Sequence, residues 1–366
     1  MLYIMYNILQ RMKQREEYER GRGNMKTKIV SLMLVMTMAV GVLTGCGTKA
    51  EETTTTSGDG YQKMELVMAV NGTDIQIDTL VAKKFAELVE EASGGNVTVA
   101  VFPNDQLAGG NATKGIEMIA VGSVDLAAYA TSVLSVLDGQ MSIATIPWSF
   151  TNYTEARTVI DETGGDYYAK LLEEKGITYL GSFHNGFRQI SNSKHEVRTP
   201  EDVKGLKIRV PGSEVYMDFF RELKADPISM SWSEVFTAIQ QGAIDGQENG
   251  VSITDSAKMY EIQDYMTLWN YTYENDLFVA NTEIWESLEP KTQELLKEKA
   301  VEACNWGRDR VEQEEAEIVQ KFRDFGVTVT ELTEEELQVF KEAVQPVREK
   351  FMNKYGEEAC EAFQIQ

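Results

Sequence analysis

Alternating apolar and polar positions predict a series of strand–helix–strand units along the chain. Residues 64–70 have the pattern of a strand, residues 77–92 repeat apolar side chains at helical spacing, and residues 97–102 form a second strand pattern. In residues 206–210, Leu, Ile and Val alternate with Lys and Arg, as in a strand with one apolar face. Strands that alternate with helices are typical of parallel sheets. The pattern therefore predicts an α/β fold.

Two pairs of strand patterns predict crossings between two parts of the fold. Residues 177–183 and 187–192 are predicted as two strands joined by a short link, and residues 265–271 and 277–281 as a second pair.

One helical pattern is unusually long. It runs from 290 to 325 and would span about 54 Å at roughly 1.5 Å per residue, which is too long for a single lobe. A helix lying across two lobes fits this length, and two helices broken at Gly307 are the alternative. Further helices are predicted at 153–174 and 334–354, with a last strand at 327–330.

One local pattern occurs twice. In 116–125 and in 237–246 a short helix ends at a glycine, and an Asp opens a strand soon after. The repetition predicts two pseudo-equivalent lobes, although coincidence also fits a single pair of matches. A chain of 366 residues is long enough for two such domains. The predicted boundaries are 62–184 for the first part of lobe I, 185–273 for the first part of lobe II, 274–314 for the return to lobe I with the spanning helix, and 315–366 for lobe II and the C-terminal helices.

Residues 1–45 have the pattern of an export signal. A stretch with two lysines precedes an apolar run, 29–42, that is short for a membrane span. The Leu-Thr-Gly-Cys sequence ending at Cys46 resembles a bacterial lipobox, which predicts cleavage before Cys46 and lipid attachment to its thiol. An uncleaved anchor helix is the alternative. The preceding residues are unusual for a signal peptide, so we expect translation to begin at Met25.

The net charge of the chain limits the kinds of ligand that it can bind. Seven of the 35 Lys and Arg and three of the 58 Asp and Glu lie in 1–45, so the rest of the chain carries 28 basic and 55 acidic residues, a formal net charge of −27. Such a chain does not bind nucleic acid through a basic face, and an anionic ligand would need a local arginine cluster. Arg188 and Arg209 are the arginines in strand-like apolar settings. Residues 47–61 are polar and are predicted to be a flexible tether.

Arg209 is the first candidate for contact with an anion. Pro211 cannot continue a central strand, so Arg209 lies near the carboxyl end of its strand, where ligand crevices form in α/β sheets. Its planar guanidinium suits a carboxylate, and a surface ion pair is the alternative. Asp245, Glu248 and Asn249 lie at or just past the start of a later strand.

The segments K-I-R-V-P at 207–211 and S-E-V-F-T-A-I-Q-Q-G-A-I-D-G-Q-E-N at 233–249 resemble the signature of the DctP family, the solute-binding proteins of TRAP transporters. The resemblance extends from about Glu65 to the C-terminus. It implies a two-lobed, periplasmic-binding-protein-like α/β fold, with a ligand cleft between the lobes, crossing strands and a long helix spanning both.

The resemblance also implies the ligand-binding residues. Arg209 would hold the carboxylate of an organic acid, Arg188 would supply a second arginine, and Asn249 and Asn71 would bond hydroxyl or carbonyl groups. For Asn71, a plain turn or helix cap is the alternative.

Two aromatic residues complete the predicted site. In members that bind sialic acid, the segment after Tyr129 carries a Glu and an Arg, but this chain has Ala130 and Val133 there. This argues against sialic acid and leaves Tyr129 as a wall residue. Trp232, in the predicted helix start at Ser231, is included as a ligand contact.

The function implied is the extracytoplasmic, lipid-anchored binding subunit of a TRAP-type transporter. It would act as a monomer, capture an organic acid, and deliver it to the small and large membrane subunits. The alternatives are a ligand-presenting subunit for a membrane sensor and a surface hydrolase using Asp245 and Glu248. No cofactor or metal is expected, because the two histidines form no metal-ligand spacing and no catalytic motif is present. The ligand's identity and any pairing of Cys304 with Cys360 stay open.

Overall fold

The computed structural model describes residues 60–366. The chain divides into two units, Met1–Gln62 and the compact Lys63–Gln366. The predicted signal, the lipid site at Cys46 and nearly all of the predicted tether lie outside the described residues. No helix in the described part is both long and apolar enough to cross a membrane.

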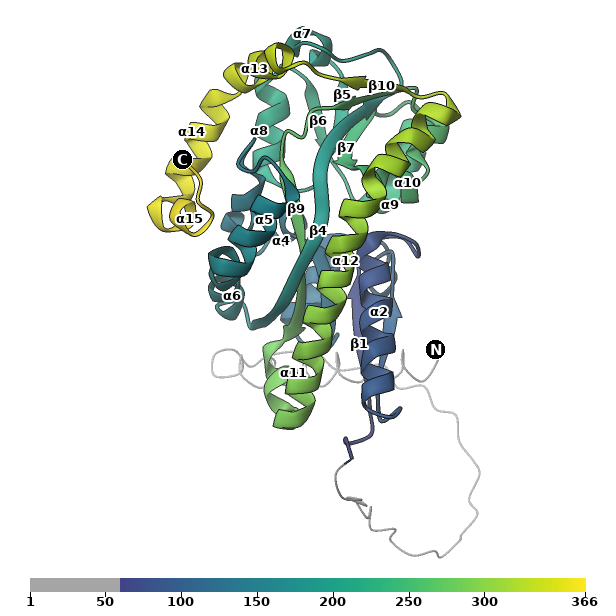
Figure 1. Cartoon of the computed structure of the whole chain (residues 1–366), viewed down its shortest axis with the longest axis vertical. Helices are drawn as coiled ribbons and strands as arrows, with labels where there is room; N and C mark the ends of the chain where they lie inside the picture. Colours follow the sequence, from purple (N-terminus) through teal and green to yellow (C-terminus); the bar gives the residue numbers. More distant parts are fainter. Residues whose placement is uncertain (1–59) are drawn as a thin grey trace, which may run out of the picture. The chain divides into compact units, whose positions relative to one another are not determined.

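The strands form two groups that share one long strand, β4 (Figure 1). Hydrogen bonding runs in the order β2-β1-β3-β9-β4-β7-β5-β6, and β8 joins β4 to β10. The strands are β1 (Met64–Val70), β2 (Val97–Phe102), β3 (Leu126–Ala130), β4 (Ile177–Asn192), β5 (Lys207–Val210), β6 (Asp226–Ser229), β7 (Gly246–Gly250), β8 (Tyr265–Leu268), β9 (Tyr273–Asn281) and β10 (Thr328–Glu331).

Each group is a short parallel sheet closed by a crossing strand. In lobe I, built on β1 to β3, β1 runs parallel to both neighbours, and β3 pairs antiparallel with β9. In lobe II, built on β5 to β7, β5 runs parallel to both neighbours, and β7 pairs antiparallel with β4. The predicted two-lobed α/β fold with crossing strands is confirmed. The strand β6 was not predicted, because it contains Pro227 and a proline argues against a central strand. It lies at the edge of the sheet, where a proline is tolerated.

The repeated pattern in the two halves has one structural role. In lobe I the Asp125 carboxylate accepts a hydrogen bond from Val67 N at 2.7 Å, and Asp125 N donates to Val67 O at 3.0 Å. In lobe II the Asp245 carboxylate accepts from Lys207 N at 2.9 Å, and Asp245 N donates to Lys207 O at 2.8 Å. Each aspartate therefore ties the helix–strand turn to the neighbouring parallel strand, which explains why the same residue type stands at both places.

The long helix α12 is unbroken from Pro290 to Phe325, which confirms the spanning helix. It lies along β4 and α2 (Ile77–Ala92) in Figure 1. At Gly307 an added Cβ would come within 2.4 Å of Val81 Cγ2. The glycine therefore permits close helix packing instead of marking a break.

The remaining helices cover the faces of the two lobes. They are α3 (Ala112–Ala120), α4 (Thr131–Leu134), α5 (Tyr153–Val159), α6 (Gly165–Glu173), α7 (Pro200–Val203), α8 (Glu214–Glu222), α9 (Trp232–Gln240), α10 (Val251–Ser256), α11 (Thr282–Ser287), α13 (Glu334–Ala343), α14 (Gln345–Tyr355) and α15 (Glu357–Ala362).

Several predicted elements have different boundaries. Of the strands expected at 265–271 and 277–281, the first, β8, ends at Leu268, and the second, β9, begins at Tyr273 because its pairing with β4 includes residues expected to form a link. The two strands expected at 177–183 and 187–192 are one strand of 16 residues, because backbone pairing with β9 and β7 continues through Gly186. A π-helical turn, Ile160–Gly164, interrupts the helix expected at 153–174. The helix expected at 334–354 divides between α13 and α14, next to a proline that cannot donate a backbone hydrogen bond.

Cys304 and Cys360 are both free thiols in the described part of the chain, and Cys304 is buried. The structure therefore answers the pairing question that the sequence left open.

Candidate functional site

Four of the predicted ligand residues lie at or just past the carboxyl ends of parallel strands in the two lobes. Asn71 follows β1 and Tyr129 lies in β3, while Arg209 lies in β5 and Asn249 in β7. Such strand ends form the usual ligand crevice of α/β sheets.

The two lobes touch directly beside this crevice. Trp232 Nε1 donates to Gln76 Oε1 at 2.9 Å, and Ser233 Oγ donates to the Gly110 carbonyl at 3.1 Å. Both donors stand in the first turn of α9, and both acceptors belong to lobe I loops. The structure is therefore a closed arrangement in which lobe II lies against lobe I.

Arg209 is buried without an acidic partner. Its side chain is 4% exposed. Its Nε and Nη2 donate to the Met230 carbonyl at 3.1 and 3.0 Å, and the guanidinium lies 5.2 Å from the ring centre of Trp232. Burial lowers the pKa of Arg209 from 12.5 to about 10. Within residues 60–366, Nη1 forms no hydrogen bond and the guanidinium no ion pair, so a buried cation is left without the anion it needs.

Arg188 has the opposite environment. Its Nε and Nη2 donate to the Glu248 carboxylate at 2.6 and 2.8 Å, Nη2 also donates to the Glu248 carbonyl at 2.9 Å, and Nη1 donates to Asn185 Oδ1 at 3.1 Å and to Glu274. Burial lowers the pKa of Arg188, but attraction to the two glutamates outweighs this and raises it well above its usual value. All five N–H groups of Arg188 thus have protein acceptors. Direct contact between Arg188 and a ligand stays a prediction, and in this conformation it would require a donor to change partner.

Asn71 and Tyr129 meet at a carboxylate that the sequence analysis did not select. Asp105 accepts from the Tyr129 hydroxyl at 2.6 Å and from Asn71 Nδ2 at 2.5 Å. Burial raises the pKa of Asp105. The helix α3 passes close to this group, because a Cβ at Gly115 would lie 2.1 Å from the Tyr129 hydroxyl oxygen.

Two more carboxyl groups are buried nearby. Asp78 accepts from the backbone N–H groups of Gly72 and Thr79, at 2.7 and 2.8 Å, and burial raises its pKa to about 7. Asp276 accepts from Asn185 Nδ2 at 3.0 Å, and burial raises its pKa well above the usual range. Three carboxyl groups, those of Asp78, Asp105 and Asp276, are therefore buried on the lobe I side.

Comparison with known proteins identifies the family. The family described as bacterial extracellular solute-binding protein, family 7 (DctP), matches residues 68–355. The chain belongs to the DctP family.

Relatives of this DctP-family chain bind acids of different kinds. It is 31% identical over 298 residues to the 2,3-diketo-L-gulonate-binding periplasmic protein YiaO of Escherichia coli K12, covering 81% of this chain and 89% of that protein. It is 30% identical over 280 residues to the C4-dicarboxylate-binding protein DctB of Bacillus subtilis, covering 76% and 79%.

A solved TRAP periplasmic solute-binding protein from Ralstonia eutropha H16, with bound (S)-2-hydroxy-2-methyl-3-oxobutanoate, shares the fold. Its TM-score is 0.79 and its identity 31%, over 82% of this chain and 98% of that one.

In this DctP-family protein, the two carboxylates considered as a catalytic pair for a hydrolase, Asp245 and Glu248, bind different partners. Glu248 is held by Arg188 and by the Tyr271 hydroxyl at 2.7 Å. Asp245 is held by Lys207 N and lies 3.2 Å from Lys194 Nζ. Within the described residues, no group of three or more His, Cys, Asp or Glu is arranged to hold a metal.

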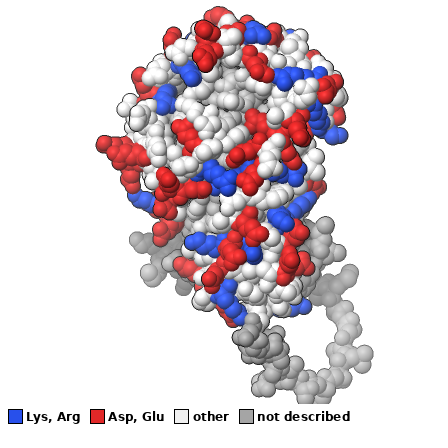
Figure 2. All heavy atoms as spheres, in the orientation of Figure 1, with Lys and Arg blue, Asp and Glu red and all other residues white. Residues whose placement is uncertain are grey.

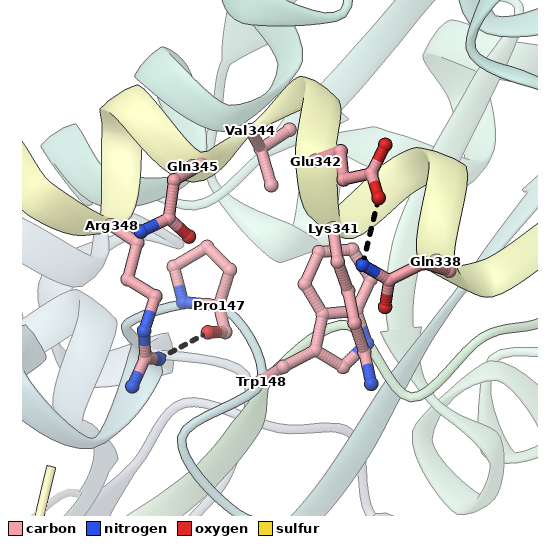
Figure 3. A pocket seen from close by; sticks show the side chains of 8 residues that line it. All are labelled: Pro147, Trp148, Gln338, Lys341, Glu342, Val344, Gln345 and Arg348. Carbon is pink, nitrogen blue, oxygen red and sulfur yellow. Dashed lines mark hydrogen bonds between the residues drawn. The ribbon is translucent and has the colours of Figure 1, made fainter. Parts of the chain in front are cut away.

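A separate cavity of about 550 Å³ lies between the loop at Trp148 and the C-terminal helices, and contains none of the predicted ligand residues (Figure 3). Arg348 from α14 spans part of it, donating to the Pro147 carbonyl at 2.8 Å and to the Gln366 carbonyl at 2.6 Å. The guanidinium of Arg348 thus has protein acceptors, unlike Nη1 of Arg209. The surface seen in Figure 2 carries acidic and basic side chains interspersed, with no basic face that would attract anions broadly.

Asp105 and Glu274 were the partners that sequence reasoning missed. Asp105 stands in a Pro103–Gly110 loop with a left-handed backbone (φ +49°), a conformation in which Asp and Asn are enriched. That loop composition was the available signal for Asp105. Glu274, 86 residues from Arg188, carried no local signal.

Proposed function

We propose that the protein is the extracytoplasmic solute-binding subunit of a TRAP-type secondary transporter, and that it binds an organic acid with Arg209 as the carboxylate clamp. The observation that carries the proposal is the buried guanidinium of Arg209, which has no acidic partner in the described part of the chain. A ligand carboxylate would accept from Nη1 and the remaining Nη2 hydrogen, forming a charge-assisted bidentate contact.

Closure follows from where the contacts lie. A ligand on Arg209 of lobe II is next to Trp232, whose indole is hydrogen-bonded to Gln76 of lobe I. A ligand that touches both lobes stabilises the closed state by the contacts it makes only there. Asn249 and Asn71 would bond hydroxyl or carbonyl groups of the ligand, and Tyr129 would form part of the wall.

Arg188 has an additional role in this proposal. It joins β4 to Glu248 of β7 and Glu274 of β9, all three fully or nearly fully buried. The ion pairs hold the crossing strands in register beneath the ligand, whether or not Arg188 also touches it.

Export and anchoring complete the proposal. Cleavage before Cys46 and lipid on its thiol would hold the binding unit, as a monomer, at the outer face of the cytoplasmic membrane, beside the small and large transporter subunits. Labelling with a radioactive fatty acid tests this step. Wild type should incorporate label and Cys46→Ala should not, and a labelled Cys46→Ala protein would contradict lipid attachment at this thiol.

The function itself is tested by native mass spectrometry of the purified protein, followed by titration calorimetry with the acid that is released. One acid should bind per chain and remain chemically unchanged. Recovery of a converted product would instead support an enzyme.

A further inference from the structure

We infer that the ligand is a hydroxylated monocarboxylate, with its carboxylate on Arg209 and its hydroxyl groups directed toward Asp105, and that dicarboxylates are strongly disfavoured. The inference rests on the proposed function and narrows its ligand class. It follows from how the charged groups are distributed between the two walls of the cleft.

One wall supplies a single free cation. Of the two arginines selected for the cleft, Arg188 has every N–H group bonded to protein acceptors, whereas Arg209 keeps Nη1 free of hydrogen bonds to residues 60–366. A second ligand carboxylate would therefore find no second guanidinium with donors to spare.

The opposite wall presents Asp105. Gly110 N donates to the Asp105 carbonyl at 3.0 Å, and the Gly110 carbonyl accepts from Ser233 at the start of α9. The neighbouring Trp232 packs over the guanidinium of Arg209. These contacts join the loop that carries Asp105 to the first turn of α9, whose Trp232 covers Arg209, and a ligand that reaches from Arg209 toward lobe I would meet this loop.

Asp105 has acceptor capacity left for a ligand hydroxyl. Each of its carboxylate oxygens receives one hydrogen bond, from Tyr129 and from Asn71, although a carboxylate has about four acceptor positions. An alcohol can donate to such a group, whereas an ionised carboxylate cannot. Burial raises the pKa of Asp78, on the same side, to about 7, so the ionised fraction of this carboxyl at neutral pH adds to the repulsion that a second negative charge would meet.

The test compares acids matched in carbon number. Calorimetry at neutral pH would use 2,3,4-trihydroxybutanoate against butanedioate, and the six-carbon pair of a pentahydroxyhexanoate against hexanedioate. The better hydroxy acid should bind at least about a hundredfold more tightly than its dicarboxylate partner, since juxtaposed like charges cost several kcal/mol.

Asp105→Asn provides a second readout that a purely structural role would not change. It removes one negative charge while keeping the size of the side chain, so the ratio of hydroxy-acid to dicarboxylate affinity should fall at least about tenfold. Any residual binding of a dicarboxylate to wild type should strengthen as pH falls from about 8 to about 6. The reason is that the second carboxylate of the ligand is accepted more readily when the carboxyl groups of the opposite wall are protonated.

The outcomes separate the two proposals. A dicarboxylate that binds as well as its matched hydroxy acid, or an unchanged ratio in Asp105→Asn, would overturn the ligand class while leaving an acid-binding protein. Binding of neither kind of acid, including the acid recovered from the purified protein, would overturn the proposed function.

Discussion

Replacement of Arg209 by alanine should nearly abolish ligand binding while leaving the fold intact. The pKa of Arg209 falls from 12.5 to about 10 on burial, which corresponds to about 3 kcal/mol favouring loss of the charge. A ligand carboxylate offsets this penalty by pairing with the guanidinium. Removing one partner of such a desolvated pair typically costs about 3–5 kcal/mol, because the other charge is left unpaired.

The expected loss is therefore about two to four orders of magnitude in affinity. Arg209→Lys should recover only part of it, because an ammonium cannot reproduce the planar pair of donors. Arg198 is the matched control: its side chain is 45% exposed and pairs with Glu196 and Glu336 on the surface. Arg198→Ala should change affinity by less than about 1 kcal/mol.

Titration calorimetry with the co-purifying acid measures all three variants. Thermal unfolding without ligand should show little destabilisation in Arg209→Ala, since this arginine forms no ion pair with residues 60–366. Wild-type affinity in Arg209→Ala would refute the clamp, and equal losses in Arg198→Ala would show that the effect is general electrostatics.

Three further substitutions test other parts of the site and the fold. Trp232→Phe keeps a ring over the guanidinium but removes the donor to Gln76, so calorimetry should show a loss of about 0.5–1.5 kcal/mol in ligand binding; no loss would mean that this contact does not stabilise closure. Gly115→Ala should lower the free energy of unfolding in denaturant by about 1–3 kcal/mol through its clash with the Tyr129 hydroxyl, and the cost of Gly115→Ala should be smaller in a Tyr129→Phe background, where the clashing oxygen is absent. Burial lowers the pKa of His184 from 6.5 to about 3. As pH falls, the histidine of the unfolded chain is protonated before that of the folded chain. The stability contributed by the neutral ring is therefore lost progressively between about pH 6.5 and about pH 3. The destabilisation caused by His184→Gln should accordingly shrink from about pH 7 to about pH 5, and a gap that widens on acidification would contradict a buried neutral histidine.

Local sequence patterns predicted the elements that depend mainly on the residues within them. Alternation and the following proline placed Arg209 correctly near the end of a buried strand. The length of the apolar repeat predicted α12, where Gly307 is explained by packing against Val81 and not by a turn.

The sequence patterns could not predict which residues far apart in the chain would pair with each other. Arg188 looked like a free ligand donor because its partners Glu248 and Glu274 lie 60 and 86 residues away. The same limit applies to β4, since Asn185 and Gly186 have the composition of a link between two strands. Only the pairing with β9, which resumes at Gly186 after a register shift, makes them part of one strand.

The continuity of β4 also has a mechanical consequence. A strand that is hydrogen-bonded in both lobes cannot act as a loose loop, so rotation of one lobe against the other must twist the strand itself. Its register shifts, between Tyr179 and Gly181 and between His184 and Gly186, are the places where the ladder is already irregular and torsion is least costly. Opening and closing of the lobes should therefore bend β4 mainly at these two places, while the regularly paired stretches on either side move with their own lobes.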